Sequence, residues 1–309
     1  MKTKFIPLLS LLLFLFAACN DSVDSISEPP VIEEQDEIDV ISENTPENIP
    51  SLLFVDIENL TLNQFNLNTY EVSTLFDVPN GPSGVLAYDP INELIYYTDY
   101  DSETILRNTL DGENEQVVVD DAYDVRAMTL NPNSQTLYFA SYTDDDIIAV
   151  NLRNLTKSIA VNGPGLRSYG NLQDMEYVDG KFYSITPVEN KESVFRATPN
   201  SNNVAQVLGY EEAGYGYGLG VDEVNGHIYF NNVEQGAILR SDLNGGNIET
   251  VINLDRVRVY GLVADGEANK LYWTTWGDQI GISNLDGSDE IVLEIPGAGR
   301  NLIKVDLPE

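Results

Sequence analysis

A tyrosine-containing strand pattern recurs along this chain at a nearly constant spacing. The matching segments are IYYTD (95–99), LYFAS (137–141), FYSIT (182–186), IYFNN (228–232) and LYWTT (271–275). Their tyrosines follow one another at steps of 42, 45, 46 and 43 residues. A period of about 40–45 residues is the length of one four-stranded blade of a β-propeller. The spacing therefore predicts an all-β repeat protein.

Each unit also contains signals for three further strands. Seven residues before most of the tyrosines a polar residue ends a β-like run, as Asp89 does in GVLAYDP and Asp222 in GLGVDE. This pattern predicts a strand, a tight turn and a second strand. Eleven residues after the tyrosine a third strand carries an arginine, as at Arg107 and Arg240, and a glycine turn leads to a fourth. Each unit is predicted to be an antiparallel meander.

Fragments at the two ends of the repeat region complete one more unit. The segment from LLFVD (52–56) onward matches strands two to four, and LIKVDLPE (302–309) matches strand one and stops. We therefore predict a six-bladed propeller over residues 51–309, in which the C-terminal strand completes the N-terminal blade. Closing the ring in this way removes exposed sheet edges.

The repeat resembles a known family at its best-matching positions. YYTD at 96–99, followed by ILRNTLDG at 105–112, resembles the YWTD, or class B, repeats of the low-density lipoprotein receptor family, and Tyr272-Trp273-Thr274 is the next match. The resemblance implies structural roles for Tyr96, Tyr272, Trp273 and the motif aspartates Asp99 and Asp56, which bond between blades in that family. Four second strands depart from the motif and have neutral residues at the aspartate position: Ser141, Thr186, Asn232 and Thr275.

The N-terminus reads as an export signal. Lys2 and Lys4 precede an apolar run over residues 5–16 and the small-residue site FAAC. These features are typical of a cleaved leader, and the run is too short to span a bilayer. Cys19, the single cysteine, resembles the lipidated residue of a bacterial lipoprotein lipobox, although Phe16 stands where leucine is usual. We expect a signal peptide over 1–18 and lipidation at Cys19; ordinary cleavage with an incidental cysteine is the alternative.

Residues 19–50 have the composition of a disordered tether. The stretch from 20 to 50 holds ten acidic residues, four prolines and no lysine or arginine, so it repels itself and buries little apolar surface. We expect it to hold the propeller away from an envelope membrane. Asp21 and Asp24, close behind Cys19, resemble a surface-export signal, and simple solvation explains them equally well. Outer-membrane or cell-surface placement therefore stays open.

Composition argues against several kinds of catalytic site. The chain has one cysteine and one histidine, His227, among 309 residues. A Cys–His pair or a histidine-rich metal site is therefore excluded once Cys19 is lipidated, and a Ser–His–Asp triad would need His227, which follows a turn. No cofactor is predicted. Calcium is the only metal considered, because carboxylates are plentiful, with candidates in TDYDSE (98–103) and YTDDDI (142–147).

An enzymatic alternative concerns the central channel. Six-bladed propellers include calcium-dependent lactonases with carboxylates and amides around the channel. Asp174 and Glu176 fall on a first strand in this sequence, and Asn231 and Asn232 on a second strand. A lactonase-like hydrolase is therefore the alternative to a binding function.

Basic residues give the main signal for binding. The net charge is −34, yet several arginines lie in the connections that lead into first strands, which emerge on one face around the channel mouth. Arginine and tyrosine often dominate binding energies. We predict a mouth that recognises a protein, peptide or acidic glycan, built from Arg126, Tyr169, Asn171, Tyr217, Arg256, Arg258, Tyr260, Arg300 and Asn301.

The alternative for these arginines is pairing with neighbouring acids such as Asp124 or Asp255. Arg107, Arg196 and Arg240 are set apart, because a position that repeats between blades indicates a structural role. The strong negative charge argues against nucleic acid, whose phosphates would be repelled. The sequence thus predicts a lipid-anchored envelope protein with one propeller serving as a binding module.

Overall fold

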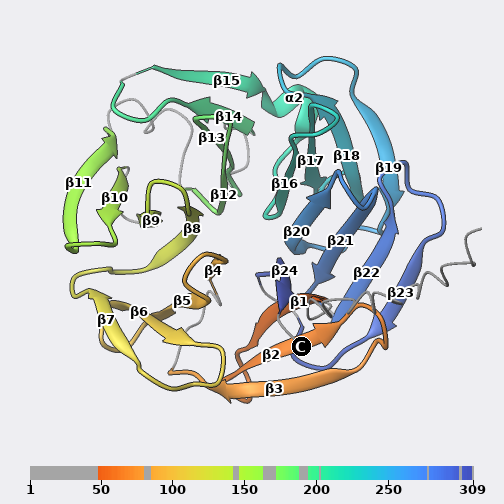
Figure 1. The fold of residues 1–309 in the computed structure, drawn as a ribbon. Coiled ribbons are helices and arrows are strands. Elements are labelled where there is room, and N and C mark those ends of the chain that lie inside the picture. The colour runs from red at the N-terminus through yellow and green to blue at the C-terminus, as the bar shows by residue number, and fades with distance from the viewer. Residues whose placement is uncertain are drawn as a thin grey trace, which may run out of the picture. The chain divides into compact units, whose positions relative to one another are not determined.

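Six antiparallel sheets of four strands each form a ring (Figure 1). The prediction of an all-β six-bladed propeller is therefore confirmed. The computed structural model describes residues 48–79, 85–141, 146–162, 172–187, 194–201, 203–276, 278–298 and 301–307. Outside this part lie the predicted leader, Cys19 and the tether up to residue 47, together with Tyr169, Asn171 and Arg300. No helix among the described residues is long and apolar enough to cross a membrane.

The first three blades each run from an innermost strand outward. Blade 1 consists of β24 (Ile303–Leu307), β1 (Ile49–Asp56), β2 (Thr61–Asn66) and β3 (Val72–Asp77). Blade 2 consists of β4 (Leu86–Asp89), β5 (Leu94–Asp99), β6 (Thr104–Thr109) and β7 (Gln116–Val119). Blade 3 consists of β8 (Val125–Asn131), β9 (Thr136–Ser141), β10 (Ile147–Asn151) and β11 (Thr156–Val161).

The other three blades follow the same plan. Blade 4 consists of β12 (Asp174–Val178), β13 (Lys181–Ile185), β14 (Val194–Ala197) and β15 (Val204–Leu208). A short helix, α2 (Tyr210–Ala213), precedes blade 5, which consists of β16 (Leu219–Asp222), β17 (His227–Asn232), β18 (Ala237–Asp242) and β19 (Glu249–Asn253). Blade 6 consists of β20 (Val259–Asp265), β21 (Lys270–Thr275), β22 (Gln279–Asn284) and β23 (Ile291–Glu294).

The ring closes through the C-terminal strand. β24 pairs antiparallel with β1, with Ile49 opposite Leu307 and Leu53 opposite Ile303. Val305 and Leu307 are buried in a core shared with blade 2. Burying two such side chains stabilises the closed form by roughly 1.5–3 kcal/mol each. β1 begins at Ile49, two residues before the start predicted for the propeller at residue 51.

The strand directions define two faces. The start of each inner strand lies beside the end of its neighbour, as Val125 of β8 lies opposite Ser141 of β9. The connections into the inner strands and the turns between second and third strands therefore share one face, which we call the mouth face. The opposite end, which we call the terminus face, carries Ile49 and Leu307. Both ends of the propeller thus leave from the face opposite the predicted binding loops.

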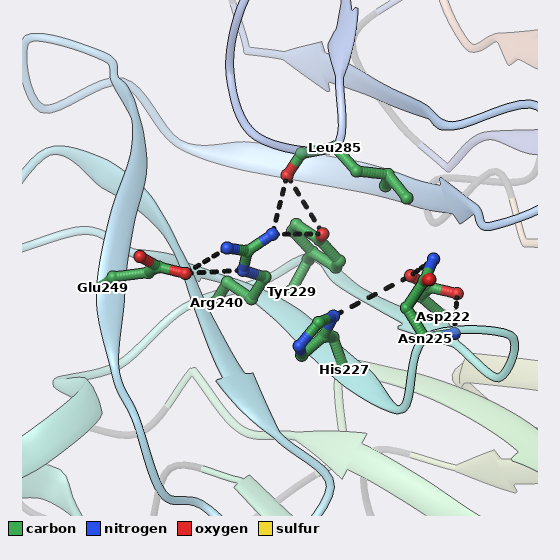
Figure 2. A network of polar contacts seen from close by, with 7 residues as sticks. All are labelled: Asp222, Asn225, His227, Tyr229, Arg240, Glu249 and Leu285. Atoms are coloured by element: carbon green, nitrogen blue, oxygen red, sulfur yellow. Dashed lines mark hydrogen bonds and ion pairs between the residues drawn. The ribbon is translucent and has the colours of Figure 1, made fainter.

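The repeated tyrosines and arginines meet across neighbouring strands. Tyr96 lies opposite Arg107 and Tyr229 opposite Arg240. Figure 2 shows the blade 5 pair: Arg240 donates to Glu249, to the Tyr229 hydroxyl at 3.3 Å and to the Leu285 carbonyl of blade 6 at 3.4 Å. The eleven-residue spacing in the sequence is therefore the register of one hairpin, and its arginine braces two blades.

The core fills the wedges between neighbouring blades. Trp273 of blade 6 is fully buried and packs with Tyr229 of blade 5. Opposite it on β22 stands Gly281, where an added Cβ would lie 1.9 Å from the indole ring. The motif tryptophan therefore fits because its partner strand has no side chain at that point.

The motif aspartates stabilise turns. Asp99 accepts the backbone N–H of Asp101 at 3.0 Å and the hydroxyl of Ser102 at 2.6 Å, both within its own turn. A hydrogen bond between blades comes from a different repeat position, because Asp89 accepts the side-chain amide of Gln135 of blade 3 at 2.9 Å. Asp56 repeats the pattern of Asp99 with Glu58 and Asn59.

Candidate functional site

The segment GYGYG at 214–218 presents two tyrosines on the mouth face. Its backbone is held on both sides, because the Tyr215 carbonyl accepts the N–H of Val233 at 3.0 Å and the Gly218 carbonyl accepts that of Asn231 at 3.1 Å. At Gly216 an added Cβ would lie 1.8 Å from the Asn231 carbonyl oxygen, so only glycine fits there. Close packing of the backbone therefore fixes the position from which Tyr217 projects.

Arg258 lies over the ring of Tyr217. The guanidinium carbon is 5.3 Å from the ring centroid, within the range of a cation–π contact. Arg258 also donates a hydrogen bond to the Tyr260 hydroxyl, and this bond is the main reason that the pKa of its guanidinium is raised. The side chain is nevertheless exposed. A cation is thus positioned by aromatic groups while part of its surface stays open to a ligand.

A tryptophan extends this cluster. The rings of Tyr217 and Tyr260 have centroids 4.7 Å apart, and the ring of Trp276 lies 5.2 Å from that of Tyr260. The backbone N–H of Trp276 donates to the Arg258 carbonyl at 3.1 Å, and the residue is 55% exposed. We call Tyr217, Arg258, Tyr260 and Trp276 the aromatic–arginine patch. It lies where blades 5 and 6 meet on the mouth face.

The remaining predicted mouth residues are not part of this patch. Arg126 forms an ion pair with Asp124 at 2.8 Å, so the neutralising role holds for this arginine. Arg256 is exposed, in a turn with a positive φ of 67°. Asn301 accepts the N–H of Leu302 at 2.7 Å and lines the channel. Tyr169, Asn171 and Arg300 lie outside the described residues.

Trp276 was not predicted from the sequence. The predicted binding residues all belong to the connections that enter inner strands, whereas Trp276 stands in the turn after β21. A large aromatic residue directly after a strand and before glycine, in TTWGD, is the signal that could have found it. The turn matters because it shares the mouth face with those connections.

The central channel contains a cavity of about 760 Å³. Among the described residues that line it, Pro90, Glu93, Pro132, Asn48 and Asp306 belong to the terminus face. The cavity also reaches Asn301 toward the mouth face, but none of the four residues of the aromatic–arginine patch lines it.

Two carboxylates of β12 face the neighbouring inner strand in this channel. Asp174 accepts the backbone N–H of Leu219 at 3.0 Å, and Glu176 accepts that of Val221 at 3.0 Å, so both link blade 4 to blade 5. Burial raises the pKa of Asp174 to about 7 and raises that of Glu176 well above its usual value, where the nearby Asp174 adds to the effect. Both side chains remain partly accessible from the channel.

The other groups of the lactonase alternative have structural contacts. Asn231 donates to the Ala237 carbonyl at 3.2 Å and accepts the N–H of Val259 at 3.3 Å, and Asn232 accepts that of Gln235. Within the described ranges, no group of three or more His, Cys, Asp or Glu residues is placed to hold a metal ion. Residues 142–145 of the second calcium candidate lie outside those ranges.

His227 lies at the start of β17, on the terminus face. Its Nδ1 is 4.0 Å from Asp222 Oδ2, and Asp222 is bonded to the backbone and side chain of Asn225 (Figure 2). These contacts belong to the turn that joins β16 to β17.

Comparisons with known proteins agree on the fold. No family model matches the chain. The propeller of a nidogen/laminin complex aligns with a TM-score of 0.71 at 15% identity, over 82% of this chain and 98% of that chain. A gluconolactonase from Xanthomonas campestris aligns at 0.57 with 14% identity, over 72% of this chain and 82% of that one. Regucalcin, a calcium-binding protein from Agrobacterium tumefaciens, aligns at 0.56 with 14% identity, over 70% and 75%. These similarities establish the propeller architecture that this chain shares with both binding proteins and enzymes.

Proposed function

We propose that this protein is a membrane-anchored, extracytoplasmic binding module that recognises a protein partner through the aromatic–arginine patch. The observation that carries the proposal is Arg258, exposed but positioned by Tyr217 and Tyr260, with Trp276 55% exposed beside them. Rigid aromatic side chains and a pre-positioned guanidinium are the groups that most often carry interface energy. Because the rest of the protein is strongly acidic, a carboxylate on the partner would be attracted mainly at this point.

The two faces support the same proposal. The described chain begins at Asn48 on the terminus face, and the patch lies on the mouth face. With lipid at Cys19 and an acidic tether before residue 50, as the sequence predicts, the tether would join the propeller on the face opposite the patch and leave the patch uncovered. The nidogen/laminin complex, the fold neighbour with a TM-score of 0.71, supports protein binding as a use of this architecture.

The proposal is tested by capture and affinity measurement with matched variants. The purified full chain would be immobilised as wild type, Arg258→Ala, Trp276→Ala and Arg153→Ala. Arg153 is an exposed arginine in a turn of the terminus face and serves as the control. A partner enriched from envelope extract should then be purified and titrated against each variant. We expect wild-type affinity for Arg153→Ala and at least a tenfold loss, about 1.4 kcal/mol, for each patch variant.

Four results would count against this proposal. If Arg258→Ala binds the partner as tightly as wild type, the patch does not take part in recognition. Capture of an acidic polysaccharide without protein would mean that the partner is a glycan and not a protein. Binding that is lost with a chelator but unaffected by the patch variants would favour a calcium-dependent site, and turnover of a lactone substrate under the same conditions would favour the hydrolase alternative.

A further inference from the structure

A second pocket lies between blades 2 and 3 and has no part in the aromatic–arginine patch. Its volume is about 330 Å³, within the range of small-ligand sites. One wall is the connection that leads from β7 to β8, and the other is a face of blade 3. The connection is held in place because the N–H of Ala122 donates to the Glu103 carbonyl at 2.7 Å. The pocket therefore has a fixed wall on each side.

The floor of the pocket is an apolar row. Ile148 of β10 is the register partner of Phe139 on β9 and of Ile159 on β11. Because direct cross-strand partners share one face of a sheet, the three side chains form a continuous strip. Phe139 is buried, whereas Ile159 is 50% exposed at the outer end. The strip thus runs from the core to the open side of the pocket.

Polar groups surround this strip. Lys157 stands two residues from Ile159 on β11 and forms an ion pair with Asp121 of the connection. Ser141 and Asp146 also line the pocket, as does Tyr123, which is 46% exposed. The ring of Tyr100 is 6.5 Å from that of Tyr123, and interaction with Tyr100 raises the pKa of the Tyr123 hydroxyl. Both hydrogen-bond donors and acceptors therefore border the apolar floor.

We propose that this pocket binds one neutral sugar ring. A pyranose has an apolar face of C–H groups, which Ile148 and Ile159 of this strip can cover, and a rim of hydroxyls that both donate and accept hydrogen bonds. The pocket offers both partners, since Asp121 accepts and Lys157 donates. The ring of Tyr123 is placed to cover a sugar at the open end.

The charges of the pocket distinguish this ligand from an ionic one. Lys157 is already paired with Asp121, so it offers little net attraction to an anion, and Asp146 adds a negative charge. An anion would also meet the field of a protein with net charge −34. A neutral hydroxyl-rich ligand has no such penalty. The inference does not rest on the proposed function, because the aromatic–arginine patch belongs to blades 5 and 6.

Ligand-observed saturation-transfer NMR and titration would test the proposal with defined probes. The purified full chain would be mixed with maltose, cellobiose and N,N′-diacetylchitobiose, and with glucuronate as an anionic probe. We expect saturable binding of at least one neutral disaccharide and at least a tenfold weaker affinity in both Tyr123→Ala and Lys157→Met. Tyr70→Ala is the matched control, because Tyr70 is also 46% exposed but lies in a turn of blade 1.

The controls separate a folding defect from a lost site. Thermal unfolding of each variant should match wild type, and Arg258→Ala should bind the disaccharide normally. The proposal is overturned if none of the neutral disaccharides binds, if glucuronate binds more tightly than all of them, or if both pocket variants retain wild-type affinity. Loss of sugar binding in Tyr70→Ala or Arg258→Ala would also place the sugar elsewhere.

Discussion

Arg240 and Arg258 each lie against a tyrosine ring, at 5.9 Å from Tyr229 and 5.3 Å from Tyr217, yet they belong to different parts of the molecule. Arg240 stands on a third strand, and its donors are used by Glu249, by the Tyr229 hydroxyl and by a carbonyl of the next blade. Arg258 stands in a connection and is exposed. Arg240, at a repeated position, therefore links two blades, whereas Arg258, which has no counterpart in the repeat, keeps its side chain exposed.

The strongest test of this difference between repeated and non-repeated positions removes a whole repeated strand. Deleting residues 302–309 takes away β24, so β1 loses its partner and the core loses Val305 and Leu307. We expect the cooperative unfolding transition to be lost, because the pairing edge of β1 is exposed and buried apolar surface is lost. Calorimetry and limited proteolysis would show it. A truncated chain that melts like wild type would mean that blade 1 does not depend on closure.

The next test replaces each of the two arginines with alanine and compares the stability of the two variants. Arg240→Ala should lower the free energy of unfolding by about 1.5–3 kcal/mol, because it leaves Glu249 and the Leu285 carbonyl without a charged donor. Arg258→Ala should change it by less than about 0.5 kcal/mol, as expected for an exposed side chain. Chemical denaturation of both variants measures the difference. The difference between repeated and non-repeated positions is contradicted if Arg258→Ala is the more destabilising of the two.

The fold was predictable because its signal is repeated. The spacing between Tyr96 and Arg107 recurs between Tyr229 and Arg240, and in both cases it is the register of one hairpin. The closing strand was predictable as well, because the two terminal fragments together contain one set of four strands. Because the same weak local signals recur in every repeat, departures at single motif positions did not obscure the six-bladed pattern.

The candidate site was predictable only in part, because its residues occur once. Tyr217, Arg258 and Tyr260 were found by their place in the connections and by their residue type, but sequence could not show that Arg126 pairs with Asp124 instead. Trp276 joins the patch from a different turn. Which loops converge depends on the three-dimensional path of each connection, and that path is not periodic.

A smaller effect is expected from the carboxylates that link blades 4 and 5. The pKa of Asp174 is raised from 3.8 to about 7, so between these pH values the folded protein binds more protons than the unfolded chain. Stability from this group is therefore full below pH 3.8 and is lost as pH rises through 7. Because the side chain is partly open to channel water, we expect a loss on the order of 1 kcal/mol.

Asp174→Asn measures that contribution. The variant keeps an oxygen that can accept the Leu219 N–H, and it should lose this pH dependence. Denaturation at pH 5 and pH 8 in the same salt would give the difference between variant and wild type. Salt must be held constant, because self-repulsion of an acidic protein also weakens it at high pH. Parallel pH profiles for the two proteins would mean that Asp174 is fully solvated.

The smallest effect is expected at the single histidine. His227 lies on the terminus face and its Nδ1 is buried without a hydrogen bond among the described residues, so His227→Gln should change the free energy of unfolding by less than about 0.5 kcal/mol. Affinity for a partner at the patch should also be unchanged. Because any Ser–His–Asp mechanism in this protein would need this residue, the variant separates binding from such catalysis: a hydrolytic activity of the wild type that disappears in His227→Gln would show that a residue outside the mouth face carries function.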